Sequence, residues 1–405
     1  MATTKNFSVD RETEQAVRSI LEQVANDGDA AVRRYTSEFD RVDLTDFRLD
    51  ETKIQEAFDQ ADPNLVDSLK LMATRLVEWH EQELPSDIEL VEADVTRRQR
   101  FVPVDSVGIY VPGGAASYPS TVLMNAIPAK VAGVERVVMV TPVTGLGMEV
   151  LVAAKIAGVT EIYTIGGAQA VAALTFGTES IQAVDLIVGP GNRFVAEAKR
   201  QVYGIVGIDS VAGPSEVVVI ADETAHPDRI AADLLAQAEH DRDAVAIAFV
   251  PTEAMKADVD ANVERRLQQL PRQEIARRAM ENGGVFVASL DDAIAEANRL
   301  AAEHLELAVA NPQEVVKLIR HAGMIFLGHE TPETLGDYVA GTNHVLPTSG
   351  TARFASGLSA RTFLRHQTML EATREGVARL SNAAKTVARV EGLEAHAQAI
   401  EVREN

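Results

Sequence analysis

Hydrophobic residues recur every three or four positions through the N-terminal part of the chain. Charged residues fill the intervals in segments 12–24 and 29–39, and a similar pattern runs over about residues 63–83. One face of an α-helix repeats about every 3.6 residues, so this spacing predicts amphipathic helices. Segment 91–102 is typical of extended chain and leads into a second extended segment, 104–111.

From about residue 108, short apolar segments alternate with alanine-rich ones. The expected strands are residues 137–141, 161–165 and 184–188, and the expected helices are residues 148–157, 168–176 and 192–203. This alternation predicts a parallel sheet with helices on its faces. Glycine clusters follow the extended segments at Gly113-Gly114, Gly166-Gly167 and Gly189-Pro190-Gly191. Open α/β sheets bind ligands at the carboxyl ends of their strands, which is where these glycines are expected.

A second alternating pattern begins near residue 216. Its expected strands are residues 217–221, 244–250, 284–287 and 322–327, and its expected helices are residues 229–239, 291–304 and 312–321. Segment 361–401 is rich in Ala, Arg and Glu, has few bulky apolar residues, and is expected to be helical. Such a helix has little apolar surface for a core of its own, so we expect it to pack on another subunit. The expected fold is α/β, with two Rossmann-like parallel-sheet domains, a helical N-terminal region and a C-terminal helical tail.

Composition narrows the possible functions. The chain has 405 residues, 46% of them hydrophobic, and a net charge of −22. A surface this acidic repels nucleic acids and anionic membranes, so neither is an expected partner. The chain has no cysteine, which excludes thiol catalysis and a thiolate zinc site and fits a reducing compartment. We see neither a targeting segment at residues 1–7 nor an apolar run long enough to span a membrane, and we expect a soluble, cytoplasmic protein.

Four segments in the second half of the chain place histidines beside carboxylates or an amide. They are Gln237-Ala238-Glu239-His240, Glu303-His304, the loop 337–344 and the segment 391–396. Each has an ordinary alternative: a surface helix end for the first and last, a helix terminus for the second, and a connecting loop for the third. Together they supply oxygen and imidazole ligands and a spare acid–base pair, as a metal site for redox or hydrolytic chemistry requires.

The turn Gly189-Pro190-Gly191-Asn192 precedes an expected helix, where backbone N–H groups could bind a pyrophosphate. The turn lacks the GxGxxG pattern, so the nucleotide signal is weak. Gly166-Gly167-Ala168-Gln169 repeats the arrangement one βα unit earlier and strengthens it. A pair of tight βα turns without a ligand is the alternative.

Taken in order, these motifs resemble the histidinol dehydrogenase family. The matching segments span about residues 28–396 and include 107–114, 123–126, 188–192, 212–216, 235–240, 303–305, 341–348 and 392–396. The resemblance implies oxidation of L-histidinol to L-histidine through L-histidinaldehyde, with one Zn²⁺ per subunit and NAD⁺ used twice. It also implies a homodimer with shared active sites. Residues 108–215 would form an incomplete Rossmann-like cofactor domain, residues 1–107 together with 216–360 the main α/β domain, and residues 361–405 the C-terminal tail on the partner subunit.

The resemblance also implies a role for particular residues. Glu303 and His304 would be the catalytic acid–base pair. The implied zinc ligands are Gln237, His240, Asp337 and His396, with His396 donated by the second subunit. The implied cofactor contacts are Tyr110, Gln169 and Asn192. The implied substrate contacts are Ser120, Ser215, Gln237, His240, His304, Asp337, His344, Glu391 and His396.

Two other functions remain open at this stage. A related branch of the superfamily oxidises hydroxyalkyl sulfonates such as sulfopropanediol and would share the metal and acid–base residues. The segments that hold Ser120, Ser215 and Glu391 resemble the histidinol version, which favours histidinol. A non-catalytic metal- or nucleotide-binding module is the third possibility. Zinc and manganese are both compatible with the implied ligands.

Overall fold

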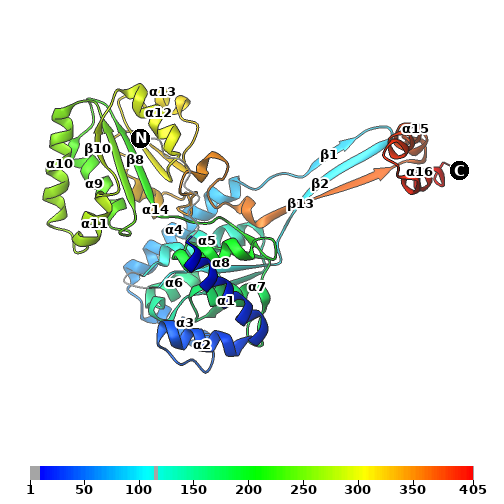
Figure 1. Cartoon of the computed structure of the whole chain (residues 1–405), viewed down its shortest axis with the longest axis horizontal. Coiled ribbons are helices and arrows are strands. Elements are labelled where there is room, and N and C mark those ends of the chain that lie inside the picture. Colours follow the sequence, from blue (N-terminus) through cyan, green and yellow to red (C-terminus); the bar gives the residue numbers. More distant parts are fainter. Residues whose placement is uncertain (1–9, 114–116, 405) are drawn as a thin grey trace.

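A computed structural model describes residues 10–113 and 117–404. Residues 1–7, considered above for targeting, and Gly114 of the first glycine cluster lie outside the described residues. Two parallel sheets form the body of the molecule, and a long arm projects from it (Figure 1). Among the described residues, no helix has the length and apolar character needed to cross a membrane.

The first sheet has the strand order β5-β4-β3-β6-β7, and all neighbouring strands pair in parallel. Its strands are β3 (Ser106–Tyr110), β4 (Arg136–Val140), β5 (Glu161–Tyr163), β6 (Leu186–Val188) and β7 (Gly207–Ile208). Side chains alternate along β3: Val107 and Ile109 enter one core, and Tyr110 enters the core on the other face. Both faces are covered by helices, which confirms the expected α/β class.

The N-terminal helices pack on this first sheet. One face carries α3 (Glu51–Gln60), α4 (Pro63–Gln82), α5 (Pro119–Ala132) and α6 (Met148–Ala157). The other carries α1 (Arg11–Asp27), α2 (Asp29–Asp40), α7 (Gly167–Phe176) and α8 (Arg193–Val202). This differs from the expected grouping of residues 1–107 with 216–360. The reason is that apolar stripes such as Val17 on α1 and Leu76 on α4 are buried against the first sheet, a pairing that periodicity within a helix does not specify.

The second sheet has the order β10-β9-β8-β11-β12 and is also parallel. Its strands are β8 (Glu216–Ala221), β9 (Val245–Val250), β10 (Gly284–Val287), β11 (His304–Ala308) and β12 (Met324–Leu327). Helices α9 (Pro227–Ala238), α10 (Glu253–Leu267) and α11 (Gln273–Met280) cover one face. The other face carries α12 (Leu290–Leu300), α13 (Pro312–Val315) and η2 (Val316–Leu318). Shorter helical turns are η1 (Val143–Gly145), α14 (Glu333–Asp337), η3 (Thr351–Arg353) and η4 (Ala360–Phe363).

One helix boundary matters for the site. The helix expected over 291–304 ends at Leu300, because Ala301 adopts the left-handed conformation at φ 53°. His304 instead begins strand β11, parallel to β8 on one side and β12 on the other. The helix expected over 312–321 is likewise shorter and ends at Leu318.

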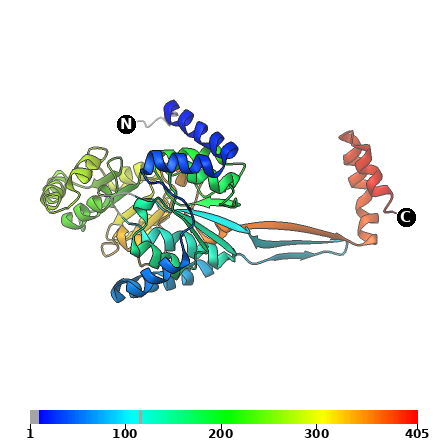
Figure 2. The same ribbon diagram turned by 90° about the horizontal axis from the view of Figure 1, so that it is seen from below.

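The arm consists of an antiparallel sheet with two helices at its far end (Figures 1 and 2). Its elements are β1 (Ile88–Val91), β2 (Val95–Pro103), β13 (Leu364–Ala372), α15 (Arg374–Val390) and α16 (Glu394–Glu401). The all-helical tail expected over 361–401 is therefore wrong in its first part, which is strand β13. Leu364 pairs with Pro103 and Ala372 with Val95, so the strand is held by a partner distant in the sequence rather than by local preference.

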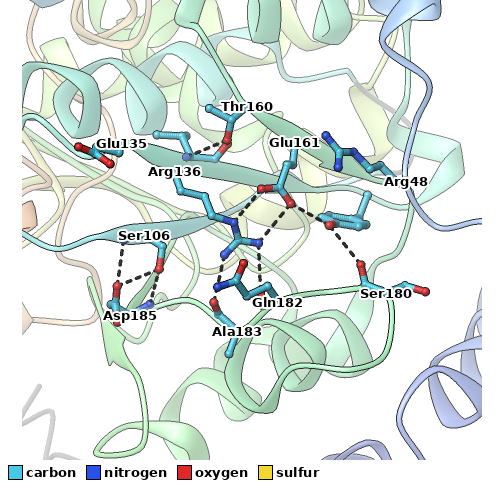
Figure 3. A network of polar contacts seen from close by, with 12 residues as sticks. Arg48, Ser106, Glu135, Arg136, Thr160, Glu161, Ser180, Gln182, Ala183 and Asp185 are labelled. Atoms are coloured by element: carbon cyan, nitrogen blue, oxygen red, sulfur yellow. Dashed lines mark hydrogen bonds and ion pairs between the residues drawn. The ribbon is translucent and has the colours of Figure 1, made fainter.

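A network of ion pairs and hydrogen bonds closes the amino-terminal edge of the first sheet (Figure 3). The Arg136 guanidinium donates to both oxygens of Glu161, at 2.7 and 3.2 Å, and to the carbonyl oxygen of Ala183 at 3.0 Å. The hydroxyl of Tyr163 donates to the same carboxylate at 2.8 Å. This edge lies opposite the glycine-rich turns, so we assign the network a structural role.

Candidate active site

The candidate site lies between β11 and α9 of the second sheet. His304 and Glu306 are two residues apart on β11, so both project toward α9, while Leu305 and Leu307 enter the core on the other face. Gln237 lies near the end of α9, and its side chain is fully buried. These residues cluster at the amino ends of the strands, because α9 runs back from the carboxyl end of β8. The carboxyl-edge rule therefore does not locate this part of the site.

His304 is the centre of the cluster. It is 4% exposed, its Nε2 lies 3.6 Å from Asp337 Oδ1, and its Nδ1 lies 3.9 Å from Glu333 Oε2. Nε2 is buried and has no hydrogen-bond partner among residues 10–113 and 117–404. Burial lowers the pKa of His304 to about 4; Asp337 acts to raise it, and His240 and His344 act to lower it further. The imidazole is thus neutral near pH 7 and can accept a proton.

Glu303 lies beside the start of the neighbouring strand β8. Its Oε2 accepts a hydrogen bond from the backbone N–H of Glu216 at 2.9 Å. Burial raises the pKa of Glu303 well above its usual value, and bonds from Glu216 and Ser215 oppose the shift. Burial also raises the pKa of Glu216 to about 7. A carboxyl group with a raised pKa is a stronger base once it ionises, as is useful for activating water.

The remaining site histidines are oriented by backbone carbonyl groups. His240 Nδ1 donates to the carbonyl oxygen of Ala236 at 3.0 Å, and His344 Nδ1 donates to that of Asp337 at 3.1 Å. Because a carbonyl oxygen only accepts, Nδ1 carries a proton in both rings, and Nε2 is the nitrogen that a neutral ring would offer to a ligand. This is the arrangement by which histidine is oriented as a ligand.

The structure thus brings together six of the expected residues: Ser215, Gln237, Glu303, His304, Asp337 and His344, with His240 exposed at the end of α9 but within electrostatic range of His304. Ser120 is buried in the first turn of α5. Glu391 and His396 are exposed at the far end of the arm, away from this cluster in their own chain (Figures 1 and 2).

The side chains of this cluster fit the implied zinc ion only in part. Within the described part of the chain, no three His, Cys, Asp or Glu side chains converge to hold a metal. Gln237 is buried, and in the amide orientation that satisfies its neighbours its nitrogen donates to Glu333 Oε1 at 3.2 Å and its oxygen accepts from Glu216 N at 3.1 Å. An amide oxygen, a carboxylate and an imidazole with a free Nε2 are chemically suited to zinc. The side chains of this cluster therefore suit Zn²⁺ but form an incomplete coordination shell, which a further ligand would complete.

The implied cofactor contacts lie in the first sheet, at the carboxyl ends of its strands. The hydroxyl of Tyr110 accepts a hydrogen bond from Gly167 N at 3.0 Å. Gln169 is 1% exposed, and its Oε1 is buried without a partner in the part of the chain that the structure describes. Asn192 Oδ1 caps α8 by accepting from Phe194 N and Val195 N. A pyrophosphate at this helix would therefore have to share or replace the cap formed by Asn192, rather than meet free N–H groups.

Sequence reasoning missed several buried acids near the site. Glu333 is fully buried, and burial raises its pKa well above the usual value. Asp233 and Glu306 share a hydrogen bond, and burial raises their pKa values to about 6 and about 9. Residue spacing could have pointed to two of these acids. Asp233 precedes Gln237 by one helical turn, and Glu306 follows His304 on the same face of a strand. His80 on α4 is also fully buried, and its Nδ1 lies 2.6 Å from a carboxylate oxygen of Glu83.

The folded protein is expected to lose stability as the pH rises from 5 to 8, and replacing Glu306 with glutamine should make this loss smaller. The folded pKa is raised, so the folded protein retains a proton that the unfolded chain releases above its ordinary pKa of 4.5. Stability from this group is complete below pH 4.5 and is lost as pH rises toward about 9. Urea unfolding of metal-free protein should show a loss between the two pH values that is smaller in the variant, by on the order of 2–4 kcal/mol. Equal pH dependence in both proteins would contradict the raised pKa.

A parallel sheet with glycine-rich turns, joined to a second sheet with a buried histidine and carboxylates, is the arrangement of an α/β oxidoreductase. The family model for histidinol dehydrogenase matches residues 3–404. The chain is 50% identical to histidinol dehydrogenase of Lactiplantibacillus plantarum over 97% of this chain and 93% of that protein. It is 50% identical to the Agrobacterium fabrum enzyme over 100% of this chain and 95% of that one. The crystal structure of histidinol dehydrogenase from Elizabethkingia anophelis superposes with a TM-score of 0.93 at 37% identity, covering 98% of this chain and 93% of that one. The chain belongs to the histidinol dehydrogenase family, and it is a dehydrogenase.

Proposed function

We propose that this chain oxidises L-histidinol to L-histidine through L-histidinaldehyde, as the last steps of histidine biosynthesis in the cytoplasm. The observation that carries the proposal is the buried, neutral His304 with a partnerless Nε2 next to Asp337, in a chain of this family. His304 Nε2 would accept the hydroxyl proton of the alcohol. In the second oxidation Glu303 would take a proton from the water that hydrates the aldehyde, and His304 would again accept a proton.

Zinc and NAD⁺ complete the proposal. Gln237, His240 and Asp337 would hold Zn²⁺ together with His396 of a second subunit, and Tyr110, Gln169 and Asn192 would contact NAD⁺. When bound, Zn²⁺ would supply a redox-inert positive charge that orients the amino alcohol, and NAD⁺ would accept the hydride in each oxidation. Ser120, Ser215, His344 and Glu391 would contact the substrate, where a carboxylate at Glu391 suits its imidazole or amino group. Support comes from Gln169 Oε1 and His304 Nε2, which are buried without a hydrogen-bond partner among the described residues. The Nδ1 contacts of His240 and His344 with backbone carbonyl groups add to it.

The arm supports the proposal of a homodimer with shared active sites. Glu391 and His396 line an apolar cavity of about 850 Å³ between α15 and α16. Helix α15 exposes Val387 and Val390, the latter at 84%, and the turn before α16 exposes Leu393. Strand β13 exposes Leu370 at 71%. Exposed apolar surface on a projecting arm is typical of an interface. A second copy would cover it and carry His396 into the zinc site of the first.

The first test is an assay of zinc-loaded protein at about pH 9, which favours the ionised form of Glu303, whose pKa burial raises. We expect about two NADH formed per L-histidinol consumed. Protein stripped of metal by a chelator is the control and should form little NADH until zinc is restored. Absence of NADH from loaded protein would reject the proposal, and faster oxidation of sulfopropanediol than of histidinol would assign the chain to the hydroxyalkyl-sulfonate branch.

A further inference from the structure

Lys199 is a lysine with an unusual degree of burial. It lies on α8, is 1% exposed, and donates from Nζ to the carbonyl oxygen of Gly189 at 2.9 Å and to the carboxylate of Asp209. The other carboxylate oxygen of Asp209 accepts from the backbone N–H of Gly189 at 2.8 Å. One ion pair therefore holds both backbone groups of a single glycine. Burying a lysine ammonium is costly unless it is paired in this way, so the pair stands out in a parallel-sheet core.

Gly189, which the ion pair holds, cannot be replaced by a residue with a side chain without strain. Gly189 has φ of +103°, and a Cβ there would lie 2.4 Å from the carbonyl oxygen of Tyr110. The turn 189–192 is thus pressed against the end of β3, where Tyr110 also contacts Gly167. The two turns implied to bind the dinucleotide, 166–169 and 189–192, are brought to one edge by this close approach.

Asp209 also lies at the start of the segment that leads to the second sheet. It follows β7 and begins the connector 209–215, which ends at Ser215 just before β8. Ser210 N donates to Asp209 Oδ1 at 2.6 Å, and further along the connector Gly213 N donates to Thr348 Oγ1 at 2.6 Å. The ion pair therefore ties the turn 189–192 to the segment that leads into the catalytic cluster.

We propose that Lys199 and Asp209 are positioning residues for the dinucleotide: they hold the turn 189–192 against Tyr110 and in register with the connector to Ser215. The inference rests on the proposed function, because it concerns the cofactor named there. The Arg136–Glu161 pair offers a comparison within the same sheet. It is also largely buried, and Figure 3 shows its contacts. Arg136 and Glu161 are the first residues of β4 and β5, so the pair lies at the amino-terminal edge, opposite both glycine-rich turns.

The test measures the dissociation constant of NAD⁺ by calorimetry on zinc-loaded protein. Lys199→Met is expected to raise it by about 10- to 100-fold, the effect of losing a charge-assisted hydrogen bond that fixes the turn. The KM for NAD⁺ should rise with it, while the KM for histidinol stays within about twofold, because no histidinol contact is altered. Arg136→Met is the matched control: it should lower the melting temperature and leave the NAD⁺ dissociation constant unchanged.

A second variant separates binding from stability. Lys199→Met alone leaves the buried Asp209 carboxylate without its cation, whereas Lys199→Met with Asp209→Asn removes both charges and keeps an oxygen for Gly189 N. The double variant should regain most of the lost stability and still bind NAD⁺ weakly. If it binds NAD⁺ as tightly as the wild type, the pair is only structural and the inference fails. Wild-type protein that binds no NAD⁺ would overturn the proposed cofactor as well as the inference.

Discussion

Replacing His304 with asparagine is expected to lower turnover of L-histidinol by about 10²- to 10⁴-fold, the usual contribution of a general base. The ring is 4% exposed, burial keeps it neutral, and its Nε2 has no partner in the structure. Asparagine retains a polar group at this position but has no nitrogen that accepts a proton near neutral pH. The loss should therefore fall on turnover, with a much smaller change in the KM for histidinol, measured by initial rates of NADH formation.

The control for this variant is His321→Asn, because His321 lies just before β12 in the same sheet and no role is proposed for it. It should retain wild-type turnover. Zinc content and melting temperature of both variants should match the wild type, which separates lost chemistry from lost structure. Near-wild-type turnover in His304→Asn protein would rule out His304 as the general base.

The order of strands and helices could be predicted because apolar periodicity is a local property. Four strands of each parallel sheet and seven of the covering helices lie close to their expected positions. Strand β11, which carries His304, was expected as the end of a helix, and β7, α3, α5, α10 and α11 were not predicted. Strand β13 could not be predicted in this way, since its sequence is polar and mostly exposed and its stability comes from pairing with β2. The packing of α1–α4 on the first sheet was missed for a related reason: an apolar stripe shows that a helix is buried, and does not show against which sheet.

In the site, too, local sequence features could be predicted and tertiary ones could not. Gln237, Glu303, His304, Asp337 and His344 could be singled out because each combines chemically active groups within a short segment. The acids beneath them could not, since Glu333 and Glu306 occur among many acidic residues in a chain of net charge −22. Only the structure shows that Glu333 is fully buried next to His304 and Gln237. Composition carries no information about which carboxylates are excluded from water.

Mixing two inactive variants, His396→Ala and His304→Asn, is expected to restore about a quarter of wild-type activity after subunit exchange. In a shared site, one subunit supplies His304 and its neighbours and the other supplies the arm. Random exchange makes about half of the dimers mixed, and in each of these one of the two sites combines an intact body with an intact arm. Activity should appear only after exchange, for example after brief dissociation in urea.

The matched control mixes His304→Asn with Glu303→Gln. Both changes lie in the body of the subunit, so every site of a mixed dimer keeps one defect and no activity should return. The position of His396 makes this comparison decisive. It is exposed on α16, at the far end of an arm with exposed apolar residues, and this end of the arm lies away from the second sheet (Figure 1). Recovery in the first mixture and not in the second requires that the arm of one subunit act at the body of another. Failure of both mixtures, with exchange confirmed by a mass-tagged subunit, would place the complete site within one chain and remove His396 from the ligand set.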